Sequence, residues 1–165
     1  MRLDELKYLN DKIDVNKYIE YREIVKSNMN YPDWLGDFSI EDINYLLNSG
    51  SKIWMYFKDN EFICSMMLIP STKDDLKKFN VNLDYKEVVD YGPMFVNPKY
   101  IGNGLQYQML REIDKYSKEK GYKYAISTVH PNNIYSINNL VRDNFELIGK
   151  KEFSRGERNI YYKKL

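Results

Sequence analysis

The segment VNPKYIGNGLQ, residues Val96–Gln106, joins a predicted strand to a predicted helix through a corner that carries two glycines. The apolar run EVVDYGPMFV leads into this segment, and Leu105, Met109 and Ile113 recur after it at helical spacing. Unpaired N–H groups at a helix N-terminus stabilise an anion, and glycine lets that anion approach the backbone closely. The corner is therefore either a tight turn or a backbone cradle for a phosphate group.

The rest of the chain predicts an α/β fold in a single domain that spans residues 1–165. The runs KIWMYFK and EFICSMMLI, parted by Asp59 and Asn60, predict an antiparallel hairpin. The later strand–helix–strand order predicts one parallel pair of strands with a right-handed crossover. We therefore expect a mixed sheet with helices on both faces. Helices are predicted over residues 15–29, from a cap at Ser39 to about Ser49, from Leu105 to Gly121, and after Asn133.

Composition bounds the class of protein. Lysine and arginine number 25 against 24 aspartate and glutamate residues, so charge gives no reason to expect a nucleic-acid partner. The chain has no apolar stretch of the roughly 18 residues that a membrane helix needs, and its first residues are too charged for a signal peptide. We expect a cytoplasmic monomer or homodimer without membrane contacts. Cys64 is the only cysteine, which excludes an intramolecular disulfide and a multi-cysteine metal site.

Comparison with known phosphate-binding motifs helps to decide whether the corner is a tight turn or a phosphate cradle. The string G-x-x-x-x-G-K-[ST] is absent, and Tyr107 stands where a dinucleotide fingerprint needs its third glycine. Instead, the corner resembles motif A of the GNAT superfamily of N-acyltransferases, V-x-P-x-[YFW]-[QR]-G-x-G-[LIV]-[GA]. The matching residues are Val96, Pro98, Tyr100, Gly102, Gly104 and Leu105, whereas Ile101 and Gln106 depart from the pattern.

A second stretch, VHPNNIYSINNLVRDNF, resembles motif B of the same superfamily and lies at the expected distance downstream. Its matching residues are Val129, Asn133, Ser136 and Phe145; Asn139, Leu140 and Asn144 replace the usual leucine, tyrosine and glycine. Both motifs fall within residues 88–145, although the order of elements agrees over most of the chain. Two motifs in the right order are much more specific than either one alone.

The resemblance implies an acetyl-CoA-dependent N-acetyltransferase whose mostly antiparallel sheet splays apart beside the motif A strand. The corner would hold the diphosphate of the cofactor, and Gln106 would either donate to it or crowd it. The motif A strand would pair with the pantetheine arm, and Asn133 would hydrogen-bond that arm. The implied cofactor-binding residues are Met94, Phe95, Val96, Ile101, Gly102, Asn103, Gly104, Leu105, Gln106, Asn133, Ser136 and Asn139.

The reaction requires a base, because an ammonium group has no lone pair with which to attack a thioester. Asp90 lies on the strand before motif A, where several members of the superfamily place a catalytic carboxylate. Apolar neighbours Val88 and Val89 favour a raised pKa for Asp90, although the carboxylate could equally face solvent. Leu140 stands at the position of the usual tyrosine acid, so Tyr135 or Tyr161 is the candidate donor to the departing thiolate, unless the thiolate leaves unassisted.

The acceptor is expected to be a small-molecule or protein amine, and the sequence carries no motif that names it. The residues we expect near it are Tyr31, Trp34, Tyr91 and His130. Arg155 and Arg158 could hold an acidic acceptor, although a solvated turn is the simpler interpretation. Two other hypotheses remain open: an acyl-CoA-binding module without catalysis, consistent with Leu140 and Ile101, and an unrelated α/β domain with a fortuitous glycine turn.

Overall fold

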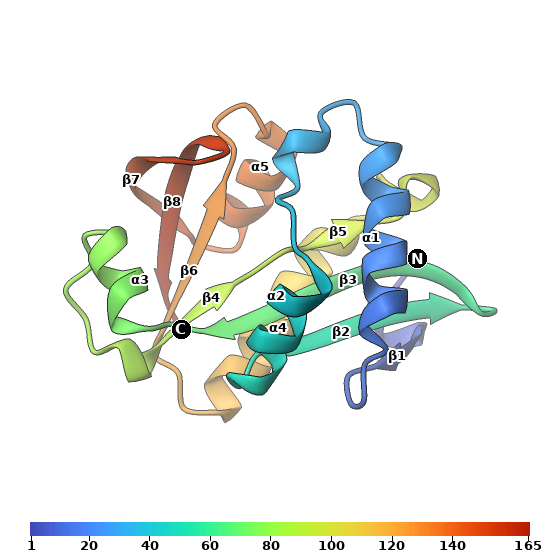
Figure 1. Cartoon of the computed structure of the whole chain (residues 1–165), viewed down its shortest axis with the longest axis horizontal. Coiled ribbons are helices and arrows are strands. Elements are labelled where there is room, and N and C mark those ends of the chain that lie inside the picture. Colours follow the sequence, from blue (N-terminus) through green and yellow to red (C-terminus); the bar gives the residue numbers. More distant parts are fainter.

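The computed structural model describes residues 1–165 and contains an eight-stranded sheet with helices on both faces (Figure 1). The strand order is β1-β2-β3-β4-β6-β8-β7, and β5 pairs with β3 beside β4. All neighbours are antiparallel except β4 and β6. The strands are β1 Lys7–Leu9, β2 Lys52–Lys58, β3 Glu61–Pro70, β4 Val88–Tyr91, β5 Phe95–Val96, β6 Tyr124–Val129, β7 Glu146–Phe153 and β8 Gly156–Lys164. The helices are α1 Val15–Ser27, α2 Ile40–Asn48, α3 Lys73–Lys78, α4 Leu105–Glu119 and α5 Ile134–Arg142.

Local sequence signals place most of these boundaries. Asp59 and Asn60 both have positive φ angles, 49° and 66°, as a two-residue hairpin turn between β2 and β3 requires. Ser39 begins α2 with a complete capping box, in which Asp42 returns the hydrogen bond. Gly121 follows the end of α4 with a φ of 86°. The predicted hairpin, the helix start at Ser39 and the helix end at Gly121 are therefore confirmed.

The centre of the sheet splits where the sequence interrupts a strand at Gly92 and Pro93. Parallel pairing of β4 with β6 ends at Asp90 opposite Ile126, whereas β6 stays paired with β8 as far as Val129. The chain after Pro93 instead follows β3 through β5, and proline cannot donate to a ladder. In Figure 1, β5 runs toward α1 while β6 rises toward α5. The predicted splay between these strands is confirmed.

The two faces of the sheet are covered by different helices. On one face, α4 packs Leu105, Met109 and Ile113 against β3, β4 and β6. On the other face, α1 and α2 cover β2, β3 and β5, and the short α3 covers β4 and β6. Figure 1 shows α1 and α2 in front of the sheet and α4 behind it. No helix combines the length and apolar composition that a membrane span requires.

A charged network is buried on the α4 face. The ammonium group of Lys163 on β8 is bonded to the carboxylates of both Asp114 on α4 and Asp143 at the end of α5. Arg111 Nη1 lies 3.2 Å from Asp143 Oδ1, and the Tyr91 hydroxyl donates to Asp114 Oδ1 over 2.7 Å. Two carboxylates that are almost inaccessible to water are thus compensated by the buried Lys163 and the half-exposed Arg111.

We predict that Lys163→Met lowers the free energy of unfolding by about 3–5 kcal/mol, because two buried carboxylates would lose their buried cation and keep only the half-exposed Arg111. Urea denaturation at pH 7 measures this change. Lys164→Met is the matched control: Lys164 is the next residue and is exposed, so it should change stability by no more than about 0.5 kcal/mol. Equal losses of stability in the two variants would contradict a stabilising role of Lys163 in this network.

Candidate active site

The glycine corner presents an array of free backbone donors. Gly102 and Gly104 have φ angles of 90° and 65°, in the left-handed region, and a Cβ added to either would meet nothing within 4 Å. The N–H groups of residues 102–107 donate to no acceptor within the chain, and no side chain caps the 15-residue α4. Together with the helix dipole, these donors make the corner suited to an anion.

Hydrogen bonds that do not use the N–H groups of residues 102–107 hold the corner in its conformation. Asn103 Nδ2 donates to the carbonyl oxygen of Tyr100 over 2.9 Å, across the turn. Gln108 Nε2 donates to the carbonyl oxygen of Asn103 over 3.2 Å, and Gln108 Oε1 accepts the N–H of Leu3 over 2.7 Å. The side chain of Ile101 is exposed. The corner is thus fixed by bonds that leave its own N–H groups unused.

Gln106 connects the N-terminus of α4 to α5. Its Nε2 donates to Ser136 Oγ over 3.0 Å, and its Oε1 accepts from Asn139 Nδ2 over 3.0 Å. Both ends of the amide are therefore engaged on α5, so the side chain neither donates to the corner nor fills it. Asn133 caps α5 through Oδ1, which accepts the N–H of Ser136, and its Nδ2 has no partner within the chain.

The strand beside the splay offers a free edge. Asn97 N–H donates to the carbonyl oxygen of Ile63 over 2.8 Å, and Phe95 pairs with Ser65. Backbone groups alternate in direction along an antiparallel strand, so those of Met94 and Val96 face the open side. The hydroxyl of Ser127 on β6 donates to the carbonyl oxygen of Tyr91 over 3.3 Å, which marks the closed end of the splay.

Asp90 lies at that closed end, in the last residue pair that joins β4 to β6. The residue is half-buried, and its carboxyl group has no hydrogen-bond partner within the chain, although its backbone pairs with β3 and β6. Burial raises the pKa of Asp90 from 3.8 to about 7; the charge of Asp75 adds to the rise and the charge of Arg155 opposes it. Asp90 is therefore a carboxyl group that can exchange a proton near neutral pH.

A stack of three rings joins the α1–α2 loop to the end of β6. Tyr31 and Trp34 stack with ring centroids 4.5 Å apart, and Trp34 stacks on His130 at 5.8 Å. The N–H of Asn132 donates to His130 Nδ1 over 3.1 Å, which fixes the imidazole. Three of the four residues predicted near the acceptor are thereby brought together on one side of the splay.

The β7–β8 hairpin closes on the same loop. Arg158 is buried, and its Nη2 donates to the carbonyl oxygen of Asp33 over 2.9 Å. The guanidinium of Arg155 lies against Gly36, where an added Cβ would stand only 2.1 Å from Nη1. The α1–α2 loop and the hairpin therefore form one wall, and Asp90 shares its charge environment with Arg155.

Two predicted residues lie elsewhere. Tyr91 is buried on the α4 face, where its hydroxyl bonds Asp114 and Ser117, so its side chain does not line the acceptor side. Adjacent residues of a strand point to opposite faces, which excludes Asp90 and Tyr91 from sharing one. Tyr135 is 79% exposed and lies about 140° around α5 from the buried Leu140, so its placement gives no support to a role as proton donor.

Sequence reasoning missed two buried polar residues on α1. Arg22 and Tyr18 are both inaccessible to solvent, and neither side chain has a hydrogen-bond partner within the chain. Their separation of four residues places them on one face of a helix. That spacing, together with the apolar Val25 on the same face, was the available signal that the arginine points inward.

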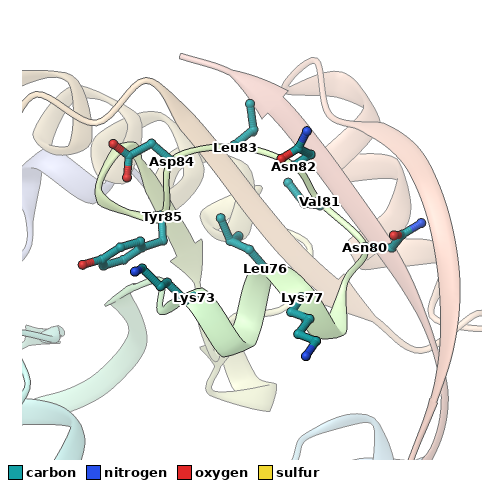
Figure 2. Close-up of a pocket in the computed structure, with 9 residues that line it drawn as sticks. All are labelled: Lys73, Leu76, Lys77, Asn80, Val81, Asn82, Leu83, Asp84 and Tyr85. Atoms are coloured by element: carbon teal, nitrogen blue, oxygen red, sulfur yellow. The ribbon is translucent and has the colours of Figure 1, made fainter.

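A cavity of about 470 Å³ lies beside α3, away from these groups (Figure 2). All of its lining residues come from one continuous segment and none belongs to either motif: Lys73, Leu76, Lys77, Asn80, Val81, Asn82, Leu83, Asp84 and Tyr85. It contains neither the free N–H array nor Asp90. The candidate active site is therefore the splay and not this cavity.

Comparisons with known proteins identify the family of this chain. The family model described as "Acetyltransferase (GNAT) family" matches residues 19–142, most of the chain. No curated protein sequence matches this chain.

Solved structures of low sequence identity share the fold. A GNAT-family acetyltransferase from Streptococcus pneumoniae superposes with a TM-score of 0.70 at 13% identity, over 96% of this chain and 99% of that one. An N-acetyltransferase from Staphylococcus aureus gives 0.70 at 13% identity, over 96% and 98%. A Bacillus subtilis acetyltransferase in complex with CoA gives 0.70 at 11% identity, over 97% and 99%.

The charge environment of Asp90 generates a prediction that needs no substrate. Arg155→Met should raise the pKa of Asp90 above about 7, because it removes the cation that favours the ionised carboxylate. Asp75→Asn should lower it, because it removes a repelling anion. Carboxyl ¹³C NMR titration measures both shifts. Shifts of the same sign in the two variants would show that Asp90 does not feel these neighbours.

Proposed function

The chain belongs to the GNAT acetyltransferase family, and we propose that it transfers an acetyl group from acetyl-CoA directly to a primary amine. Acetyl-CoA is the acyl donor of this family. The observation that carries the proposal is the array of unbonded N–H groups at residues 102–107, which opens α4 beside the free edge of β5. A carboxyl group with a pKa near neutrality lies at the closed end of the same splay.

The residues present fit the cofactor. The amides of Gly102, Asn103, Gly104, Leu105 and Gln106 would bind the diphosphate, and these groups have no competing acceptor. The outward backbone groups of Met94 and Val96 would pair with the amide-bearing pantetheine arm as a neighbouring strand does. The free Nδ2 of Asn133 is a further donor from the far side of the splay. Ser136 and Asn139 contribute by holding Gln106 on α5.

Asp90 would act as the general base. Acetyl-CoA, when bound, supplies an acetyl group activated as a thioester. The acceptor enters as an ammonium ion, and Asp90 accepts a proton from it so that the nitrogen lone pair can attack. A pKa of about 7 leaves much of Asp90 ionised at neutral pH while keeping it basic enough for this transfer. Asp90 then releases the proton to water. No side chain is assigned to the departing sulfur, since Leu140 is apolar and buried.

We predict that Asp90→Asn lowers kcat by about a hundredfold or more while the Kd for acetyl-CoA changes less than about twofold. The wild-type kcat/KM should rise with pH and level off above about 7, because the base works only when deprotonated, and the variant should lose this rise. Thiol release with a panel of amines gives the rates, and isothermal titration gives the Kd. Undiminished turnover of the variant would exclude Asp90 as the base.

The same two measurements separate the proposal from its alternative. Buried Leu140 in place of the family's tyrosine favours an acyl-CoA-binding module without catalysis. Such a module would bind acetyl-CoA and release no thiol with any amine. Absence of acetyl-CoA binding would reject both functions.

We predict that Gly102→Ala weakens CoA binding about tenfold, because a methyl group would disturb the N–H array. Gly121→Ala is the matched control: it stands at the other end of α4 with a similar φ, 86° against 90°, and an equally open Cβ position. Both substitutions should lower stability by about 1–2 kcal/mol, since both force an L-residue into the left-handed region. Equal Kd values for the two variants would contradict a role of the corner in binding.

A further inference from the structure

Arg22 is a buried cation without a partner. It lies on α1, its side chain is inaccessible to solvent, and none of its three guanidinium nitrogens has a hydrogen-bond partner. The nearest carboxylate belongs to the exposed Glu23, at 4.0 Å. The guanidinium also lies over the ring of Phe38, 5.0 Å from its centroid. Burial of an unpaired charge is costly, and a guanidinium carries five donors to be satisfied.

The neighbours of Arg22 place it on the acceptor side of the splay. Tyr18, one helical turn earlier, packs its ring on Phe95 of β5 at 5.7 Å, and its buried hydroxyl lies close enough to Arg22 that the guanidinium opposes the rise that burial gives the Tyr18 pKa. Arg22 is close enough to Arg155 to lower the pKa of that guanidinium, after burial and Arg158. Arg155 in turn lowers the pKa of Asp90. The free donors of α1 and the candidate base thus border one region.

Positive charge exceeds negative charge in this region. The guanidinium groups of Arg22, Arg155 and Arg158 lie close enough together for the other two to lower the pKa of Arg155, and Arg158 donates to the carbonyl oxygens of Asp33 and Glu157. The nearby carboxylates are Asp90, the exposed Asp37, which is ion-paired with Lys26, and the exposed Glu23. Arg22 has no carboxylate within hydrogen-bond distance, since Glu23 lies 4.0 Å away.

We propose that the acceptor is a primary amine that also bears an anionic group, a carboxylate or a phosphate, and that Arg22 binds this group. The proposal rests on the proposed function and adds the class of acceptor. A planar guanidinium binds either anion through two parallel hydrogen bonds. The amine would face Asp90 while its anionic group faces Arg22. Arg22 is thus a specificity-determining residue, and it takes no part in proton transfer.

A role in binding and a role in folding make opposite predictions for stability. If Arg22 binds an acceptor, its buried charge destabilises the protein while no acceptor is bound. Arg22→Met should then raise the urea midpoint of unfolding. If Arg22 stabilises the fold, the same substitution should lower that midpoint. Lys17→Met is the matched control, because it removes the same charge from an exposed position of α1, where Lys17 pairs with Glu20.

The acceptor preference is tested with paired amines that differ only in the anionic group. One set compares each proteinogenic L-amino acid with its carboxamide. The other set compares O-phosphoethanolamine with ethanolamine. Wild-type kcat/KM should favour the anionic member of at least one set about ten- to hundredfold, and the set identifies carboxylate or phosphate. Arg22→Met should abolish this preference while the KM for acetyl-CoA and the rates with neutral amines stay within about twofold. Lys17→Met should keep the preference.

Two results would overturn the inference while leaving the proposed function intact: faster acetylation of the neutral members, or a lower urea midpoint for Arg22→Met. If acetyl-CoA binds but no amine is acetylated, the proposed function fails instead. Titration of the L-amino acids and O-phosphoethanolamine into CoA-bound protein then decides the inference separately. Heat that disappears in Arg22→Met supports anion binding, and its absence in the wild type rejects it.

Discussion

The loss of strand pairing after Asp90 is the constraint on which the rest of the site depends. Pro93 has no N–H to donate, so the chain loses its pairing with β6 and keeps its pairing with β3, while β6 stays with β8. One interruption thereby creates a free main-chain edge, an open wedge and a closed end that holds a carboxyl group. A strand that continued along β6 would leave no wedge, and Asp90 would be one more residue of a closed sheet.

The two ligands of this site would be recognised by different parts of the chain. In the proposed site, cofactor recognition would rely on backbone N–H groups, which every residue except proline can supply. Departures from the motif pattern at Ile101 and Gln106 are compatible with it for that reason, the more so because the Gln106 amide turns to α5. The proposed acceptor recognition would rely instead on side chains from α1, the α1–α2 loop and the β7–β8 hairpin, where each substitution changes the chemistry.

Sequence reasoning succeeded where the signal was local and failed where partners were distant. The hairpin at Asp59 and the cap at Ser39 depend on neighbours within a few residues, and both were predictable. The Tyr91 side chain lies on the α4 face, opposite Asp90, and strand alternation alone could have indicated this. The partners of Lys163 lie 20 and 49 residues away, so no spacing rule could pair them. Arginine is rarely fully buried, so the residue type gave no reason to expect Arg22 in the interior.

Gly36 has a consequence for how readily this protein could change its substrate. The Arg155 guanidinium lies where the first carbon of any other side chain at position 36 would stand. The group in the way is the tip of a long, flexible side chain, so it can swing aside without disturbing the backbone. A single exchange at this loop position would therefore relocate one positive charge while the sheet, the proposed base and the net charge stayed the same. Natural variation at this position could thus alter the proposed acceptor preference without altering the fold.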